Sequence, residues 1–158
     1  MTVKEFKTLG AKHLKESPSA MLDIQVFLSH FLKKDRTFIL MNQDFEIPDE
    51  ALEKLLDAVK KRKTGLPVSY ITNSKEFFGY DFFVTEDVLI PKPDTEILVM
   101  RAIDLIKSAV NSGEKKIEIL DICSGSGCIG ISVLKTLQNE FKNQAEFTIY
   151  FSDISEKA

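Results

Sequence analysis

The residues best suited to chemistry lie around a glycine-rich bend and at the end of a later apolar stretch. The segment 124–127 reads Ser-Gly-Ser-Gly and carries almost no side chain, so it can turn sharply and let a ligand approach its N–H groups. Asp121 precedes this bend, and Asp153 follows the apolar residues 147–151. A carboxylate at residue 153 can accept two hydrogen bonds from a vicinal diol such as that of ribose.

The elements around the bend predict how these groups are positioned. Residues 117–122 are rich in isoleucine and leucine, which predicts a strand that is covered on both faces. A mostly buried helix is expected from residue 129 to 137, and a second strand from 147 to 151. Strand, glycine turn, helix, strand and acidic residue form the opening unit of a Rossmann-like nucleotide site. A polar connection at residues 138–146 makes the spacing to Asp153 longer than usual.

The identity of the nucleotide depends on the residues that flank the glycines. Residues 125–130 are a literal G-x-G-x-x-G, which on its own would suggest NAD. However, Asp121 stands near the strand end, and two further small residues precede the first glycine. The pattern Leu120-Asp121-x-x-x-Gly125-x-Gly127 instead resembles motif I of class I S-adenosylmethionine methyltransferases. That resemblance implies contacts to S-adenosylmethionine from the following residues: Asp121, Cys123, Ser124, Gly125, Ser126, Gly127 and Asp153. Cys123 stands where the motif usually has its first glycine.

The composition of the chain limits the classes of protein and of partner that we expect. The chain has 158 residues, of which 44% are hydrophobic and 28% charged, as in an ordinary globular protein. The net charge of −3 gives no basic excess, so we expect no direct binding to nucleic acid. There is no apolar run of membrane-spanning length and no signal peptide, so no membrane association is expected. The cysteines, Cys123 and Cys128, fit neither a disulfide framework nor a metal site, which favours the cytoplasm.

The first 63 residues predict a small helical bundle. Helical stripes are expected in four stretches, separated by the Ser-Pro-Ser break at 17–19, by Asp35, and by the proline and acids at 48–50. The last of these helices ends in the basic run 60–63, followed by Thr64-Gly65. Cations before a glycine are typical of a helix C-terminus, although the run could also contact RNA or an acidic partner. The bundle is a candidate docking module, or else a folding cap on the next domain.

From Leu66 the pattern changes to period two. Residues 75–85 predict an aromatic hairpin around a glycine turn, and residues 88–90 continue as an extended segment that ends at 91–93. A helix then begins at 94–96, where Asp94 or Thr95 can cap it, and ends at 111–113.

This middle region makes a second resemblance specific. Four consecutive blocks, together with the order in which they occur, resemble the HemK/PrmC family of peptide chain release factor N5-glutamine methyltransferases. The blocks are residues 65–71 (GLPVSYI), 76–79 (EFFG), 88–96 (VLIPKPDTE) and 120–129 (LDICSGSGCI). Lys92 replaces a more usual arginine. The resemblance covers nearly the whole chain.

The resemblance implies an α/β protein in three parts. These are a helical domain at 1–67 that helps to engage a release factor, a β-hairpin connector at 68–92, and the beginning of a Rossmann-like class I methyltransferase domain at 93–158. The implied reaction moves a methyl group from S-adenosylmethionine to the side-chain amide nitrogen of the glutamine in the factor's Gly-Gly-Gln loop. The implied substrate-side wall consists of Pro91, Pro93, Thr95 and Glu96.

The family's acceptor-binding motif, Asn-Pro-Pro-Tyr, does not occur in the sequence, so no catalytic residue is expected within these residues. We therefore expect them to be the N-terminal portion of a longer protein, and expect the 158-residue chain alone to be inactive.

Two other interpretations stay open at this point. The chain could be a fragment of an NAD-type oxidoreductase, which only the G-x-G-x-x-G supports, or a non-enzymatic docking module whose working part is the bundle. At the level of residues, the glycines could merely allow a tight turn, Asp121 could only brace the bend, and Asp153 could be a polar strand end. The proline-rich segment at 91–96 could serve only to start a helix.

Overall fold

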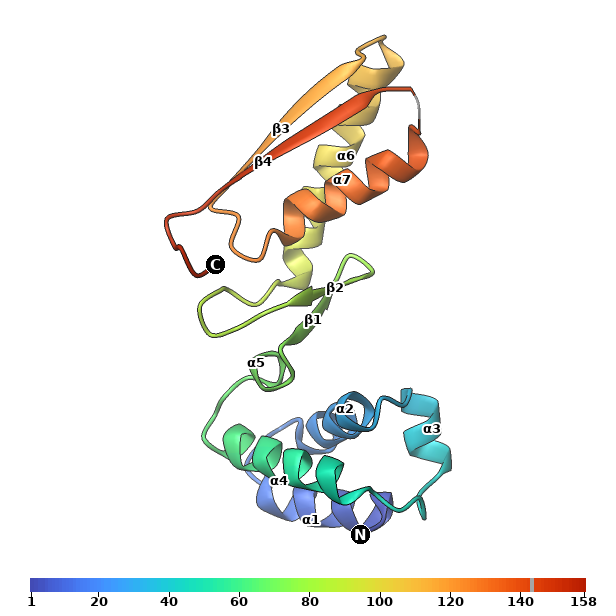
Figure 1. The fold of residues 1–158 in the computed structure, drawn as a ribbon, viewed down its shortest axis with the longest axis vertical. Helices are drawn as coiled ribbons and strands as arrows, with labels where there is room; N and C mark the ends of the chain where they lie inside the picture. The colour runs from blue at the N-terminus through green and yellow to red at the C-terminus, as the bar shows by residue number, and fades with distance from the viewer. Residues whose placement is uncertain (143) are drawn as a thin grey trace. The chain divides into compact units, whose positions relative to one another are not determined.

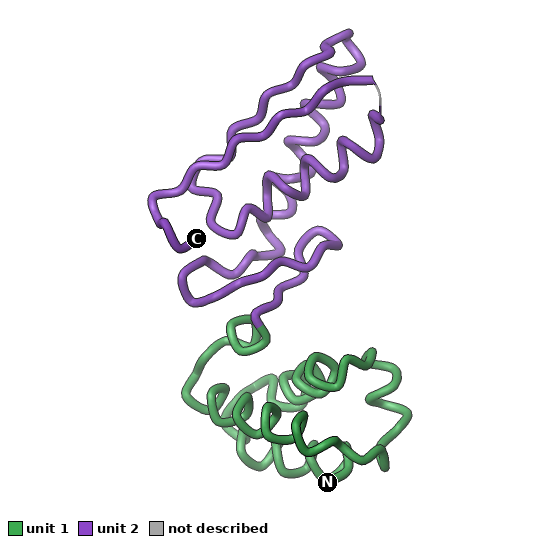
Figure 2. Tube along the Cα trace, viewed as in Figure 1, with its two compact units in different colours: residues 1–72 green, residues 73–158 purple. Residues whose placement is uncertain are grey.

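The computed structural model describes residues 1–142 and 144–158, and it divides into two compact units, residues 1–72 and 73–158 (Figure 2). The units are a helical one and a mixed α/β one (Figure 1). The helices of the first unit are α1 (Val3–His13), α2 (Ala20–Leu32), α3 (Arg36–Met41), α4 (Asp49–Lys63) and α5 (Val68–Thr72). The second unit contains β1 (Ser74–Phe77), β2 (Tyr80–Phe83), a 3₁₀ turn (Pro93–Thr95), α6 (Glu96–Asn111), β3 (Lys116–Ile122), α7 (Cys128–Glu140) and β4 (Glu146–Ser152).

The predicted breaks at 17–19, at Asp35 and at 48–50 separate the helices of the first unit. Thr2 caps α1 through a reciprocal pair of hydrogen bonds with Glu5, and the Asp35 side chain accepts a bond from the third residue of α3. The predicted break at 17–19 separates α1 from α2. The basic run ends α4, and Gly65 follows with a φ of +95°, which a residue without a Cβ adopts readily.

The core of the first unit is apolar, with one buried cation. Its buried side chains come from α1 to α4, from the residue directly after α1 and from the connection before α4: Val3, Phe6, Leu14, Ile24, Phe27, Leu28, Ile39, Ile47, Leu55, Ala58 and Val59. Lys7 is buried beside them, and its Nζ donates to the Ile39 carbonyl at 3.0 Å and to Gln43 Oε1 at 3.2 Å. The lysine therefore ties α1 to the end of α3.

The period-two pattern expected from Leu66 is wrong for its first residues, which form helix α5. The amides of Tyr70 and Ile71 donate to the Pro67 carbonyl at 3.1 and 3.2 Å, and Thr72 Oγ1 donates to the Val68 carbonyl at 3.0 Å. Val68 and Ile71 pack against the helical core. Tertiary packing thus overrides the strand preference of these β-branched residues.

The predicted hairpin is present as the antiparallel pair β1 and β2, in which Ser74 pairs with Phe83 and Phe77 with Tyr80. Phe78 and Gly79 connect the strands with φ values of +53° and +76°, the conformation of a two-residue hairpin turn. Residues 88–90 were expected to be extended. They belong to none of the described strands, and the Val88 amide donates to the Thr85 carbonyl at 3.2 Å. The 3₁₀ turn then leads into α6, and Thr95 makes no side-chain capping bond there.

Strands β3 and β4 form a parallel pair joined by α7, in which Lys116 pairs with Glu146 and Ile122 with Ser152. The helices α6 and α7 lie on one face of this pair (Figure 1). The core between them contains, among others, Val99, Ile103, Val133, Leu137, Ile117, Ile119 and Phe147.

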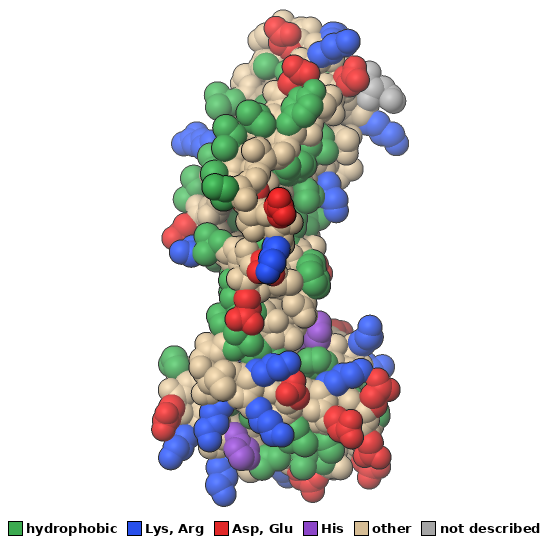
Figure 3. All heavy atoms as spheres, turned by 60° about the vertical axis from the view of Figure 1, so that its left-hand side comes forward, with side chains coloured by type: hydrophobic (Ala, Val, Ile, Leu, Met, Phe, Trp, Pro, Cys, Tyr) green, Lys and Arg blue, Asp and Glu red, His purple; other side chains and the backbone are tan. Residues whose placement is uncertain are grey.

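The expectation that residues 117–122 are covered on both faces is wrong for the described residues. Side chains alternate along β3, and the face away from the helices carries Leu120 at 60% and Ile122 at 67% exposure. Tyr150 lies on the same face, and its hydroxyl contacts Glu118 Oε1 at 3.2 Å. Figure 3 shows hydrophobic side chains gathered on the visible face of the second unit. Composition alone did not reveal that only one face is packed.

The polar connection expected at 138–146 is partly helical, since α7 continues to Glu140. It includes residue 143, which lies outside the described residues. None of the helices in the described ranges combines the length and the apolar composition that a membrane span requires.

Candidate functional site

The glycine-rich bend between β3 and α7 is held by backbone hydrogen bonds. Cys123, Gly125 and Gly127 have φ values of +60°, +51° and +69°, so the chain turns through three left-handed positions. The Ser124 amide donates to the Ser152 carbonyl at 3.0 Å, and the Gly127 amide donates to the Ser124 carbonyl at 2.8 Å. The bend is therefore tied both to itself and to the end of β4.

Asp153 lies against this bend. Its Oδ2 accepts a hydrogen bond from the Gly125 amide at 2.7 Å, and its Oδ1 accepts one from the Ser155 amide at 2.9 Å. These two amides lower the pKa of the Asp153 carboxyl, so the group is ionised at neutral pH. The side chain is exposed, and each carboxylate oxygen has a second lone pair for a ligand.

Asp121 has a different position from Asp153. It lies on the helix-facing side of β3, and its Oδ2 accepts a hydrogen bond from the Gly130 amide at 2.9 Å. A Cβ at Gly130 would lie 2.6 Å from Ile149 Cδ1, 2.7 Å from Phe151 Cε1 and 2.9 Å from Asp121 Oδ2. The last glycine of the G-x-G-x-x-G thus permits close packing of α7 on the sheet, and Asp121 braces the first turns of that helix.

A cavity of about 310 Å³ opens beside the bend, which is at the lower end of the range of ligand pockets. Four of the predicted residues line it: Ser124, Gly125, Ser126 and Gly127. The other lining residues are Phe83, Thr85, Val88, Ile131, Phe151 and Ala158, none of which the sequence had indicated as site residues. The only signal that could have found Phe151 is the period-two alternation of Phe147, Ile149 and Phe151.

The bend itself is open on the side of its first glycine. Apart from Gly125 itself and its two chain neighbours, no heavy atom of the described residues lies within 4 Å of the place that a Cβ at Gly125 would occupy. A ligand can therefore approach this backbone closely, as the residue types predict.

The other predicted residues are not among those that line the cavity: Asp121, Cys123, Asp153, Pro91, Pro93, Thr95 and Glu96. Pro91 is buried and Pro93 is exposed. Pro93 and Thr95 belong to the 3₁₀ turn before α6. Glu96 Oε1 accepts a hydrogen bond from the Phe78 amide at 3.0 Å, so it holds the hairpin turn at the start of α6.

The two cysteines differ in environment. Cys123 is exposed at the start of the bend, whereas Cys128 is buried at the first position of α7. Burial, followed by the charge of Asp121, raises the pKa of the Cys128 thiol, while a hydrogen bond with Ser126 partly opposes this rise. Cys128 is therefore a packing residue, and we expect its thiol to react more slowly than that of Cys123.

A helical unit followed by a hairpin and a β–α–β unit with a glycine bend defines a two-part mixed α/β protein. The family described as the PrmC N-terminal domain matches residues 7–72, which form nearly all of the helical unit. Those residues match that family model, and the resemblance to the HemK/PrmC family is confirmed.

Curated relatives extend the similarity beyond the helical unit. The release factor glutamine methyltransferase of Clostridium acetobutylicum is 41% identical over 137 residues, which cover 85% of this chain and 46% of the relative. The protein of the same name from Clostridium botulinum is 42% identical over 141 residues, covering 88% and 48%. That of Leptospira interrogans is 38% identical over 144 residues, covering 91% and 46%. The chain spans about half the length of these relatives.

Proposed function

We propose that this chain is part of a release factor glutamine methyltransferase that uses S-adenosylmethionine and acts in the cytoplasm. Two observations support the proposal. Relatives that carry this name align with 85–91% of the chain, and the same chain forms an open glycine bend with a carboxylate beside it. The second of these observations carries the cofactor assignment, because it concerns the chemistry of this chain's own residues.

The proposed cofactor site is the cavity beside the bend. The backbone of Ser124, Gly125, Ser126 and Gly127 forms one wall, where the lack of side chains permits close contact. Asp153 would accept hydrogen bonds from the two ribose hydroxyls, using lone pairs that the Gly125 and Ser155 amides leave available. Cys123 would contact the methionine end by its backbone, and Asp121 would act mainly by bracing α7.

S-adenosylmethionine supplies an electrophilic methyl group on a sulfonium. In the proposed reaction a bond would form between that carbon and the glutamine amide nitrogen as the carbon–sulfur bond breaks, S-adenosylhomocysteine would leave as the neutral thioether, and one proton of the nitrogen would be released to solvent. An amide nitrogen is a poor nucleophile because its lone pair is delocalised into the carbonyl. The protein must therefore hold it in line with the methyl group and exclude water.

The acceptor side of the site involves the segment before α6 in this proposal. Pro91, Pro93, Thr95 and Glu96 would form part of the wall that receives the glutamine-bearing loop, with Glu96 keeping the hairpin turn in place. The helical part, residues 1–67, would help to engage the release factor, and residues 68–92 would connect it to the domain that begins at 93. In this proposal the groups that bind the acceptor amide lie outside these 158 residues, which lack the Asn-Pro-Pro-Tyr motif.

Calorimetry with S-adenosylhomocysteine and with NAD tests the cofactor assignment. We expect the first ligand to bind and the second not to bind. The variant Asp153→Asn should weaken binding at least tenfold, because an amide can accept at only one of its two positions. Glu156→Gln, an equal change of charge three residues away, is the matched control and should leave affinity unchanged. Preferential binding of NAD would refute the assignment and favour an oxidoreductase fragment.

A second experiment tests whether the 158-residue chain contains the groups that bind the acceptor amide. The 158-residue chain is mixed with S-adenosylmethionine and a release factor that contains the Gly-Gly-Gln loop, and the factor is analysed by mass spectrometry. We expect no glutamine methylation from this chain alone. Methylation would contradict the assignment of the acceptor-binding groups to residues other than these.

A further inference from the structure

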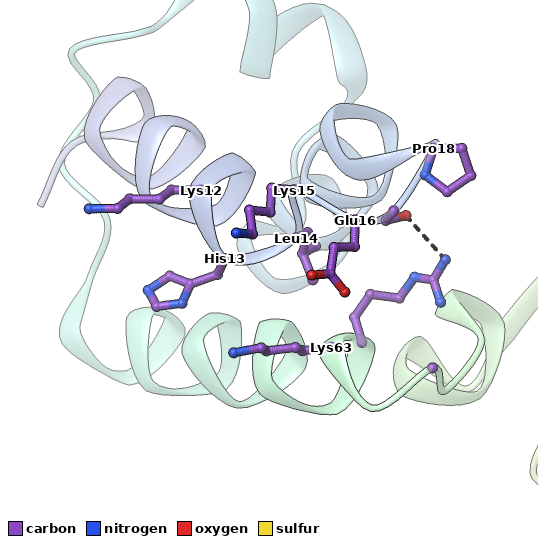
Figure 4. A pocket seen from close by; sticks show the side chains of 10 residues that line it. Lys12, His13, Leu14, Lys15, Glu16, Pro18 and Lys63 are labelled. Atoms are coloured by element: carbon purple, nitrogen blue, oxygen red, sulfur yellow. Dashed lines mark hydrogen bonds between the residues drawn. The ribbon is translucent and has the colours of Figure 1, made fainter.

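A second cavity, of about 600 Å³, lies within the helical unit. It is formed by the end of α1 and the residues that follow, 12–18, and by the end of α4 with Arg62, Lys63 and Gly65. In Figure 4, His13, Lys15 and Glu16 lie on the α1 side of this space and Lys63 on the α4 side. The cavity is separate from the glycine bend and involves none of the residues assigned to the cofactor.

The charged groups around this cavity are mostly unpaired cations. Lys12, Lys15 and Lys63 are exposed, and none of them forms an ion pair with any residue that the structure describes. Glu16 is the one acidic side chain among the described lining residues. Together these groups give the cavity a net positive charge.

Arg62, in contrast, forms hydrogen bonds and an ion pair with other residues of the protein. Its Nε donates to Asp23 Oδ2 at 2.7 Å, its Nη1 to the Leu66 carbonyl at 3.3 Å, and its Nη2 to Ser17 Oγ at 3.4 Å. The Asp23 side chain is only 7% exposed, so this is a largely buried ion pair. Arg62 therefore forms a fixed inner wall, and its charge is neutralised before any ligand arrives.

The helix macrodipole does not account for this arrangement. Cations are favoured at the C-terminus of any helix, which explains the presence of lysines in the last turns of α1 and α4. However, Lys15 lies after α1 has ended at His13, and the cations of two separate helix ends surround the same cavity. The macrodipole acts on each end alone and requires no such convergence.

We propose that this cavity binds an acidic peptide segment of a partner protein. The three lysines would contact its carboxylates, their hydrocarbon stems and the exposed Pro18 would cover an apolar side chain, and Glu16 would accept a hydrogen bond from a peptide N–H. The same features disfavour a nucleic acid. The cavity's guanidinium is already occupied, and its described lining has no Phe, Tyr or Trp on which a base could stack.

The test uses the 158-residue chain and a fluorescein-labelled peptide of alternating glutamate and leucine, with binding measured by fluorescence anisotropy. The pocket variant carries Lys12→Gln and Lys63→Gln. The control variant carries Lys4→Gln and Lys60→Gln, an equal change of charge on the same two helices, α1 and α4, but outside the cavity. Circular dichroism confirms that both variants keep the helical content of the parent chain.

We expect the pocket variant to bind the peptide about tenfold more weakly, a difference of about 1.4 kcal/mol, and the control variant to differ by less than twofold. Affinity should also fall as salt is added, because the contact is electrostatic. Equal losses in the two variants, or an absence of binding by the parent chain, would overturn the proposal. Tighter binding of a uridine octanucleotide than of the peptide would also overturn it, in favour of a nucleic-acid site.

Discussion

Replacing Gly130 by alanine tests whether the last glycine of the bend is needed for packing. The new methyl carbon would lie 2.6 Å from Ile149 Cδ1 and 2.7 Å from Phe151 Cε1, against about 3.5–4.0 Å for an ordinary carbon contact. It would also lie 2.9 Å from Asp121 Oδ2, which accepts the hydrogen bond from the same residue's amide. Three neighbours must therefore move.

The expected magnitude follows from three opposing effects. Overpacking of this kind costs about 2 kcal/mol. Loss of the hydrogen bond to the Asp121 carboxylate costs about 1.5 kcal/mol. The higher helix propensity of alanine contributes about 1 kcal/mol in the other direction. The second unit should therefore lose about 2.5 kcal/mol of stability, although alanine is the better helix former.

Amide hydrogen exchange followed by mass spectrometry measures this loss locally. Peptides from β3 and β4 should exchange roughly 60-fold faster in the variant, and peptides from residues 1–72 serve as the internal reference. Adding Ile149→Val removes the Cδ1 atom and should recover about 1 kcal/mol of the loss. Stabilisation by Gly130→Ala, or a lack of coupling to Ile149→Val, would refute the packing argument.

Three further predictions concern other residues. Ser132 is fully buried on α7, and its hydroxyl has no partner among the residues described, so Ser132→Ala should stabilise the second unit by about 1 kcal/mol in the same exchange experiment. A loss of stability would mean that the hydroxyl is satisfied. Iodoacetamide should modify Cys123 well before Cys128, because Cys128 is buried and its pKa is raised, and peptide mapping showing equal rates would contradict this. Burial lowers the pKa of Lys7 from 10.5, so the unfolded chain binds more protons and Lys7 makes a destabilising contribution that disappears as pH rises through its folded pKa towards 10.5. Thermal melts should show that Lys7→Met removes this contribution, and unchanged pH dependence would rule it out.

Much of the architecture could be predicted because its signals are local. The Ser-Pro-Ser break, the Asp35 cap and the basic end of α4 are chemical features of a few adjacent residues, and the structure follows them. The hairpin could be predicted for the same reason, from aromatic residues on both sides of Gly79.

The errors concern tertiary packing. The segment that became α5 has β-branched residues typical of a strand, yet its contacts with the helical core favour a helix. Leu120 and Ile122 have the composition of a two-sided strand, but their side chains are exposed on the face opposite α6 and α7. Sequence types cannot reveal which face of a strand a neighbour covers.

In the candidate site, too, the local features could be predicted from the sequence and the features that depend on tertiary contacts could not. The bend was predictable from the small residues at 124–127, because a lack of side chains is itself the signal. The hydrogen-bond partner of each carboxylate could not be predicted. Asp121 accepts a hydrogen bond from an amide of α7, and Asp153 accepts one from an amide of the bend. The contributions of Phe83, Thr85 and Val88 to the cavity depend on where the hairpin folds, which no local pattern encodes.

The hydrogen bond between Gly125 and Asp153 joins two positions that are 28 residues apart in the chain. Folding alone therefore orders the loop, before any small molecule arrives. A pre-organised site loses less conformational entropy when a ligand binds, so a larger share of the contact free energy appears as affinity. It also means that the free and loaded forms should share one backbone at this place.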